Sequence, residues 1–164
     1  MAKTTETKTN VMRILDQKKI AYTPHTYPHG EGLAVDGISV ARSMGQDPAR
    51  VFKTLVTQGA SKTYYVFDIP VAASLDLKKA AKAVGEKSVT MLPARELLPL
   101  TGYVHGGCSP IGMKKQFRTV LHASALEHET IVVSGGRIGA QVELPPQTLL
   151  DLVRGSTADV IVDA

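Results

Sequence analysis

The amino-acid sequence predicts an α+β fold in which helices surround one curved, mixed sheet of short strands. Many apolar segments are too short for helices and are bounded by turn residues, which is typical of strands. Segments with helical apolar spacing lie between them, so strands and helices are interleaved along the chain. A length of 164 residues with 43% hydrophobic residues fits one domain around one core.

The chain divides into a short tail and one domain. Residues 1–9 are polar and aperiodic, which predicts a disordered tail and gives no sign of a signal or transit peptide. Residues 10–164 contain no internal repeat and no low-complexity linker, so we expect them to form a single domain. No apolar run approaches the ~20 residues that a membrane span needs.

Three aspartates mark predicted helix starts. Asp36 can cap a short helix that ends at Gly45, and Asp47 precedes a proline, which is favoured at the first helical position. Asp76 can cap a helix that stops at Gly85. The other predicted helical segments are Asn10–Lys19, Pro93–Leu98 and Pro146–Arg154.

Alternating or continuous apolar runs predict the strands. Phe52–Gln58 and Thr63–Ile69 are joined by a tight connection at Gly59, as in a hairpin. The remaining predicted strands are short and are spread over the chain: Ala21–Tyr27, Gly102–His105, Thr119–Leu121, Thr130–Val133, Gln141–Leu144 and Asp159–Val162.

Composition excludes several classes of protein and locates the charge. With one cysteine the chain has no internal disulfide and no four-thiolate zinc site, and it suits a reducing, cytoplasmic compartment. The net charge is only +4, but residues 78–118 hold eight basic and two acidic residues. This segment predicts either a local anionic partner or a solvated lysine-rich face. Its candidate contacts are Lys78, Lys79, Lys114, Lys115 and Arg118.

Lys53 interrupts an otherwise apolar strand, Val51–Val56. A lysine is rarely buried without a partner because its charge is costly to desolvate. It either extends from a strand end into solvent or lines a cleft, where its ammonium would meet a carbonyl, carboxylate or phosphate oxygen.

A glycine-rich segment, Gly102–Gly112, is the second unusual feature. It is either a plain turn or a loop whose amides converge on a ligand oxyanion, since glycines let a backbone approach closely. The basic residues that follow it favour ligand binding.

Two more specific functional interpretations, a catalytic cysteine and a metal site, have little support in the sequence. Cys108 with His105 would suggest a thiol nucleophile and its base, but a lone cysteine is more often a small buried apolar residue. His25 and His29 share a face at a spacing that suits two metal ligands, yet no nearby residue completes a site. We therefore expect no metal and no cofactor.

Five sequence blocks together resemble the YbaK/EbsC family of aminoacyl-tRNA deacylases, over nearly the whole chain from about Thr9 to Asp163. They occur in order: HTY at 25–27, VFKTLV at 51–56, PVAASLDLKKAAKAVGEK at 70–87, TGYVHGGCSPIGMKK at 101–115 and VSGG in 132–136. The GG-x-SP-x-G run is the most specific of them. The resemblance implies a barrel-like sheet of the prolyl-tRNA synthetase editing-domain type.

The resemblance also implies site residues. The family's essential lysine corresponds to Lys53, and its glycine-rich loop to Gly106 and Gly107. Residues implied to contact the substrate are Tyr27, Thr54, Ser109 and Ser134, with Asp36 and Gln141 at positions where this chain departs from other members. Those two departures leave the preferred amino acid open.

The family activity is removal of cysteine from Cys-tRNA(Pro). The substrate thiol attacks the ester and releases a cyclic thiolactone, so no protein nucleophile is needed. The implied partners are the acceptor end of an aminoacyl-tRNA and prolyl-tRNA synthetase, and the oligomeric state stays open. Two alternatives also remain: a deacylase that uses water on Ala-tRNA(Pro) or another small aminoacyl-tRNA, and a non-catalytic tRNA- or synthetase-binding module.

Overall fold

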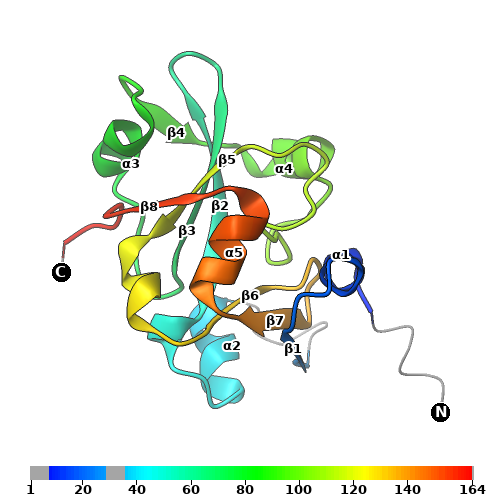
Figure 1. Cartoon of the computed structure of the whole chain (residues 1–164). Helices are drawn as coiled ribbons and strands as arrows, with labels where there is room; N and C mark the ends of the chain where they lie inside the picture. The colour runs from blue at the N-terminus through cyan, green and yellow to red at the C-terminus, as the bar shows by residue number, and fades with distance from the viewer. Residues whose placement is uncertain (1–7, 29–35, 164) are drawn as a thin grey trace, which may run out of the picture.

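The computed structural model describes residues 8–28 and 36–163, and their strands form two sheets (Figure 1). The larger sheet has the strand order β4 (Val89–Met91), β2 (Phe52–Gly59), β3 (Tyr64–Pro70), β5 (Arg118–His122), β8 (Ser156–Ala158). The smaller sheet has the order β1 (Thr23–Thr26), β7 (Ala140–Leu144), β6 (Ile131–Ser134).

The two sheets meet at the start of β2. Val51 forms a single parallel bridge with Val132 of β6, and neither sheet closes on itself. The predicted α+β class is confirmed. In the larger sheet, β2 pairs antiparallel with β3 and β4, whereas β5 pairs parallel with β3 and β8, so this sheet is mixed, as expected. The strands are not closed into a barrel, because the one bridge is too short to merge the two sheets.

Helices cover both faces of the larger sheet. The helices are α1 (Asn10–Gln17), α2 (Gly37–Ser43), α3 (Leu77–Val84), α4 (Ala94–Thr101) and α5 (Pro146–Val153), with single 3-10 turns at Pro48–Arg50 and Ala123–Glu127. Buried alanines of α3 pack with Phe67 and Ile69 on one face. On the other face, α1 and α5 contribute Leu15 and Leu149 to the main core with Val66 of β3.

The predicted helix caps are confirmed. The Asp36 carboxylate accepts a hydrogen bond from the Ser39 amide, and Asp47 and Asp76 accept from the amides of the first residues of their helices. Gly85 ends α3 in the left-handed conformation, with φ of 75°.

Two predicted strands differ from the structure, and one observed strand was not predicted. Gly102–His105 is a loop, because Gly102 ends α4 at φ 90° and the buried Tyr103 hydroxyl donates to the Ile111 carbonyl within the same loop. The last strand lies at Ser156–Ala158 instead of Asp159–Val162, whose backbone bonds to the segment before α3: Asp76 N donates to Val160 O. Strand β4 was not predicted, since three residues are too few for a visible period.

Half of β2 lies at a free sheet edge. On the side away from β3, β4 pairs only with Thr57–Gly59, and the Leu92 amide adds one bond to the Val56 carbonyl. Among the described residues, no strand pairs with residues 52–55 on that side. The stretch that contains Lys53 and Thr54 is therefore open to a ligand.

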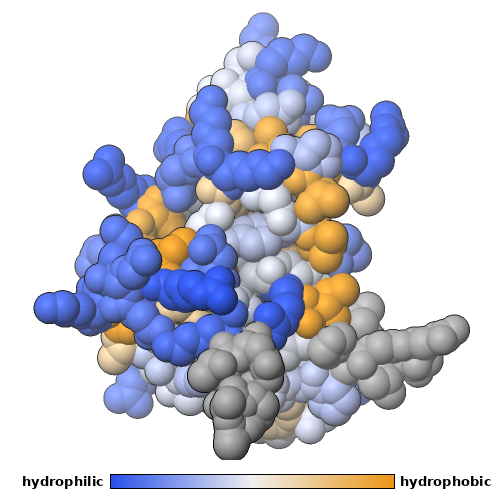
Figure 2. All heavy atoms as spheres, turned by 90° about the vertical axis from the view of Figure 1, so that its right-hand side faces the viewer, coloured by the Kyte–Doolittle hydropathy of each residue, from blue (hydrophilic) through white to orange (hydrophobic). Residues whose placement is uncertain are grey.

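No helix in the described part of the chain is long and apolar enough to cross a membrane. On the face shown in Figure 2, apolar side chains form small groups among hydrophilic ones, without a continuous apolar surface.

Candidate active site

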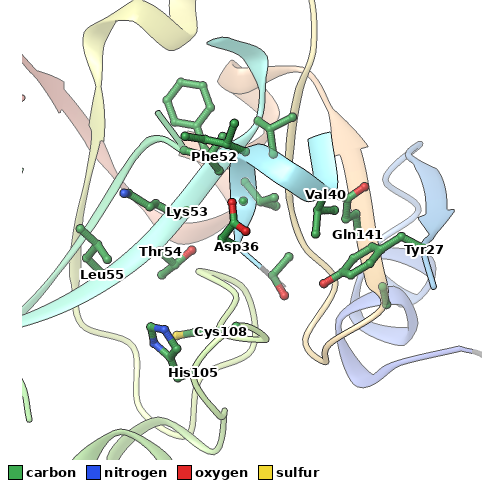
Figure 3. Close-up of a pocket in the computed structure, with 18 of the residues that line it drawn as sticks. Tyr27, Asp36, Val40, Phe52, Lys53, Thr54, Leu55, His105, Cys108 and Gln141 are labelled. Carbon is green, nitrogen blue, oxygen red and sulfur yellow. The ribbon is translucent and has the colours of Figure 1, made fainter. Parts of the chain in front are cut away.

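A cavity of about 370 Å³ lies where the free edge of β2 meets the smaller sheet (Figure 3). This volume suits a small organic group. Its walls come from the end of β1, α2, β2, α4, the loop 102–117, β6 and β7, and most of them are apolar. Its polar lining residues are Tyr27, Asp36, Lys53, Thr54, His105, Cys108, Ser134 and Gln141. Seven residues predicted from the sequence thus line one cavity: Tyr27, Asp36, Lys53, Thr54, Gly106, Ser134 and Gln141.

Lys53 supplies a cation at the free edge. Its side chain lies with that of Leu55 on one side of β2, while Thr54 lies on the other, nearer Asp36 (Figure 3). No carboxylate among the described residues forms an ion pair with Lys53, and partial burial lowers the pKa of its ammonium. A partly desolvated ammonium without a counter-ion is suited to a ligand oxygen that carries negative charge.

Thr54 is backed by a carboxyl group that sequence analysis missed. Its Oγ1 donates to Oδ1 of Asp68 at 2.5 Å, and Asp68 is fully buried on β3 directly opposite. Oδ2 of Asp68 has no hydrogen-bond partner in the described structure, and burial raises the pKa of this carboxyl to about 7. An aspartate within the apolar strand Tyr64–Pro70 was the signal that could have revealed it.

The glycine loop closes the cavity from the other side. Gly106 lines it with φ of 88°, a conformation that L side chains rarely adopt. Gly107 lies against the turn at Arg137 and Ile138, where a Cβ atom would come within 2.9 Å of the Ile138 nitrogen. The Gly107 amide donates to the Val104 carbonyl and Gly107 does not line the cavity, so its predicted role as an oxyanion donor stays a prediction.

Cys108 lines the cavity as a protonated thiol. Burial raises its pKa to about 12, so the thiolate that nucleophilic catalysis requires is strongly disfavoured near neutral pH.

We expect Cys108→Ala to keep the deacylation rate constant within about threefold of the wild-type value, because the thiol is not a nucleophile. Single-turnover deacylation of a radiolabelled aminoacyl-tRNA measures this. A complete loss of activity in a variant with native circular dichroism would contradict it and assign the reaction to the protein thiol.

Tyr27, Ser134 and Gln141 hold fixed positions around the rest of the cavity. Tyr27 is nearly buried, and its amide donates to the Gly139 carbonyl. Ser134 Oγ accepts from the Gly136 amide, and the buried Gln141 accepts a side-chain hydrogen bond from Gln46 at 3.0 Å. These side chains are held in place before any ligand binds.

Ser109 lies outside the cavity lining. It is fully buried, and its Oγ accepts from the Ile111 amide, which stabilises the loop from within. Its predicted contact with the substrate stays a prediction.

The predicted tRNA-binding residues form two groups. Lys78 and Lys79 lie on α3, and Lys114 and Lys115 lie in the loop after α4. In Figure 1, α3 and α4 lie on opposite sides of the larger sheet. Lys79 already contacts Asp159 and Asp163.

Two further basic contacts are local. Arg118 donates to the carbonyls of Ala83 and Val84 at the end of α3, where a cation is favoured. Lys114 Nζ lies 3.4 Å from the Pro99 carbonyl of α4, the helix that contributes Leu97 to the cavity wall. Of the predicted tRNA-binding residues, Lys114 thus contacts a helix that forms part of the cavity wall.

Metal binding finds no support in the described residues. His25 instead pairs with Glu143 at 2.8 Å, and Arg50 and Thr130 also bond to that carboxylate, which lowers its pKa. No cluster of three or more metal-ligating side chains occurs in the described ranges.

Comparison with known proteins decides the family. Residues 35–152 match the model of the aminoacyl-tRNA editing domain. The chain belongs to that family. A relative from Enterococcus faecalis (strain ATCC 700802 / V583), provisionally described as the Cys-tRNA(Pro)/Cys-tRNA(Cys) deacylase EbsC, is 46% identical over 96% of both chains. The predicted family resemblance is confirmed.

Two solved structures share the fold of this chain. A hypothetical protein, APE2540, superposes with a TM-score of 0.83 at 22% identity, covering 93% of this chain and 99% of its own. A protein provisionally described as a trans-editing enzyme for prolyl-tRNA synthetase gives a TM-score of 0.81 at 24% identity, with 93% and 95% covered. Both therefore share the overall fold of this chain.

Proposed function

We propose that this member of the aminoacyl-tRNA editing family is a trans-editing deacylase that removes cysteine from Cys-tRNA(Pro). The observation that carries the proposal is a cavity in which, among the described residues, a half-buried lysine has no ion-pair partner and the one cysteine holds a thiol whose pKa is raised to about 12. The 46% identity to EbsC, whose description carries the same activity, supports the choice of cysteine.

The reaction uses the thiol of the substrate. The aminoacyl group enters the cavity, and its thiol attacks the ester carbonyl, forming a thiolactone and releasing the ribose oxygen of the tRNA. Because thiol and carbonyl belong to one bound group, the attack is intramolecular and gains the advantage of a fixed orientation. Amino acids without a thiol lack this nucleophile, which gives selectivity through chemistry.

Lys53 and the glycine loop stabilise the charge that develops. The Lys53 ammonium contacts the carbonyl oxygen, or the terminal phosphate beside it, in partly desolvated surroundings that strengthen the interaction. The Gly106 amide, which bonds to no described protein group, supplies a second donor. Tyr27 and Gln141 limit the space for the amino-acid side chain.

The partners are the acceptor end of an aminoacyl-tRNA and prolyl-tRNA synthetase. The synthetase link comes from the description of one structural neighbour. The tRNA contact comes from the position of Lys114 beside α4, near the cavity.

Replacing Lys114 and Lys115 together by alanine is expected to weaken tRNA binding about tenfold at low salt and to reduce its salt dependence by the equivalent of about two phosphate contacts. Filter binding of uncharged tRNA from 50 to 200 mM salt measures the slope. The matched control replaces Lys18 and Lys62, which do not line the cavity, by alanine. If binding by the double variant depends on salt concentration as steeply as binding by the wild type, the two lysines face solvent and do not contact tRNA phosphates.

A deacylation panel tests the function. Purified protein is mixed with tRNA(Pro) charged with cysteine, alanine, serine or proline, and with tRNA(Cys) charged with cysteine. We expect fast release from Cys-tRNA(Pro) and recovery of the thiolactone by mass spectrometry. Preferential release of alanine would assign a water-dependent reaction, and no turnover with retained tRNA binding would assign a binding module.

A further inference from the structure

The mechanism proposed above leaves one proton unassigned, and the inference made here rests on that mechanism. A thiol is a much better nucleophile once its proton is removed. Cys108 is a buried thiol, and Lys53 in its ammonium form has no free electron pair, so neither side chain accepts the proton. Among the described polar residues that line the cavity, Thr54 is the one whose hydroxyl is hydrogen-bonded to a fully buried carboxyl, that of Asp68.

The geometry of this pair sets the direction of its hydrogen bond. An ionised carboxylate is only an acceptor, so Thr54 Oγ1 must donate its proton to Asp68 Oδ1, at 2.5 Å. The lone pairs of Thr54 Oγ1 are then available to a donor in the cavity that Thr54 lines. Thr54 faces the cavity, whereas Asp68 does not line it and is connected to it through its hydrogen bond with Thr54.

Asp68 also lacks an evident structural purpose. It is fully buried on β3 between Phe67 and Ile69, and its Oδ2 is unpartnered among the described residues. A buried carboxyl with an unsatisfied oxygen costs stability compared with an apolar residue at the same place. Groups of this kind cluster at functional sites.

We propose that Thr54 and Asp68 form a proton relay that accepts the proton of the attacking thiol and returns it to the leaving tRNA. Thr54 is the catalytic residue of the pair because it touches the substrate, and Asp68 is a positioning residue that acts through it.

The relay moves protons in two stages. The substrate S–H proton passes to Thr54 Oγ1 while the Thr54 proton passes to Asp68 Oδ1, and the sulfur electron pair forms the S–C bond. When the C–O bond to the ribose breaks, the ribose oxygen takes a proton from Thr54, and Asp68 returns its proton to Thr54. The products are thiolactone and tRNA, with both side chains restored.

The electrostatic surroundings suit a base at neutral pH. Burial raises the pKa of Asp68, and the hydrogen bond from Thr54 partly offsets this rise. Cys108 is a titratable group near this carboxyl, and the charge of Asp68 contributes to the raised pKa of its thiol. A base whose pKa lies near the working pH combines availability with proton affinity.

The experiment measures single-turnover deacylation of Cys-tRNA(Pro) from pH 5.5 to 8.5. Asp68→Asn keeps an acceptor for Thr54 but takes no proton, and Thr54→Val removes the hydroxyl. Each is expected to lower the maximal rate about 100-fold, with KM within threefold, and Asp68→Asn to lose the rise in rate centred near pH 7. The double variant is no slower than either single variant, because both act as one unit.

Conservative and control variants make the outcome decisive. Thr54→Ser restores the rate to within about fivefold, and Thr57→Val, which removes a buried hydroxyl elsewhere in β2, leaves it unchanged. Single variants that keep the wild-type rate, or whose losses multiply, overturn the relay while leaving the deacylase function intact. Wild-type protein that leaves Cys-tRNA(Pro) intact overturns both. If Asp68→Asn does not fold, the Thr54 series decides alone.

Discussion

Lys53→Ala is expected to lower the rate of Cys-tRNA(Pro) deacylation by about 10²–10³, the loss typical when a preorganised electrostatic contact is removed. The side chain has no ion-pair partner among the described residues, so its removal leaves no protein carboxylate unpaired and the fold should persist. Single-turnover rates and thermal unfolding of the same preparations measure both effects.

Lys53→Arg tests whether the positive charge at this position is enough for activity or whether the compact shape of the ammonium is also needed. Arginine keeps the charge but replaces a compact ammonium with a wide planar group, so we expect only partial recovery, by about tenfold over alanine. Lys18→Ala, at the end of α1, serves as the matched control for the loss of one lysine. A Lys53→Ala protein with wild-type turnover would refute the role assigned to the ammonium.

Ionisation of Asp68 should change the stability of the wild-type protein with pH in a direction opposite to ordinary acid denaturation, and Asp68→Asn should remove this change. The carboxyl has a pKa of about 7 in the folded state against an ordinary value of 3.8. Between these values the folded protein holds more protons than the unfolded chain, so its free energy of unfolding falls as pH rises. Full stability is present below about pH 4 and is lost as pH passes 7.

The measured quantity is the difference in unfolding free energy between Asp68→Asn and wild type, from urea titrations at pH 4.5, 6 and 8. The neutral amide has no such ionisation, so the difference should shift in favour of the variant by roughly 3–4 kcal/mol across this range, at 1.36 kcal/mol per pKa unit. Other carboxylates titrate equally in both proteins and cancel. A pH-independent difference would mean that Asp68 has an ordinary pKa.

Local features of the fold were predictable from sequence. The caps at Asp36, Asp47 and Asp76 depend on hydrogen bonds within three residues, so the residue types alone locate them. Lys53 stood out because a charged residue in an apolar strand is unusual at any position. The other lining residues were proposed through the family resemblance, and the structure brings them to one cavity.

What depends on long-range packing was not predictable. No sequence pattern predicts that the Gly107 amide donates to the Val104 carbonyl, or that the segment after β8 forms backbone hydrogen bonds with the segment before α3. Asp68 was overlooked because its functional partner, Thr54, lies on the neighbouring strand. The two residues are 14 positions apart in the sequence and become neighbours only when β2 pairs with β3. A sequence pattern indicates in which strand a residue lies, whereas its neighbour on the next strand is known only once the pairing of the strands is known.

The half-paired edge of β2 also bears on self-association. An unpaired strand edge is a template to which a strand of another chain can add, and proteins commonly protect such edges. Here β4 covers one half, and the walls from α4 and the glycine loop flank the other. The cavity beside this half has a volume of about 370 Å³, which suits a small organic group. The same walls that shape this cavity flank the unpaired edge and so oppose edge-to-edge aggregation.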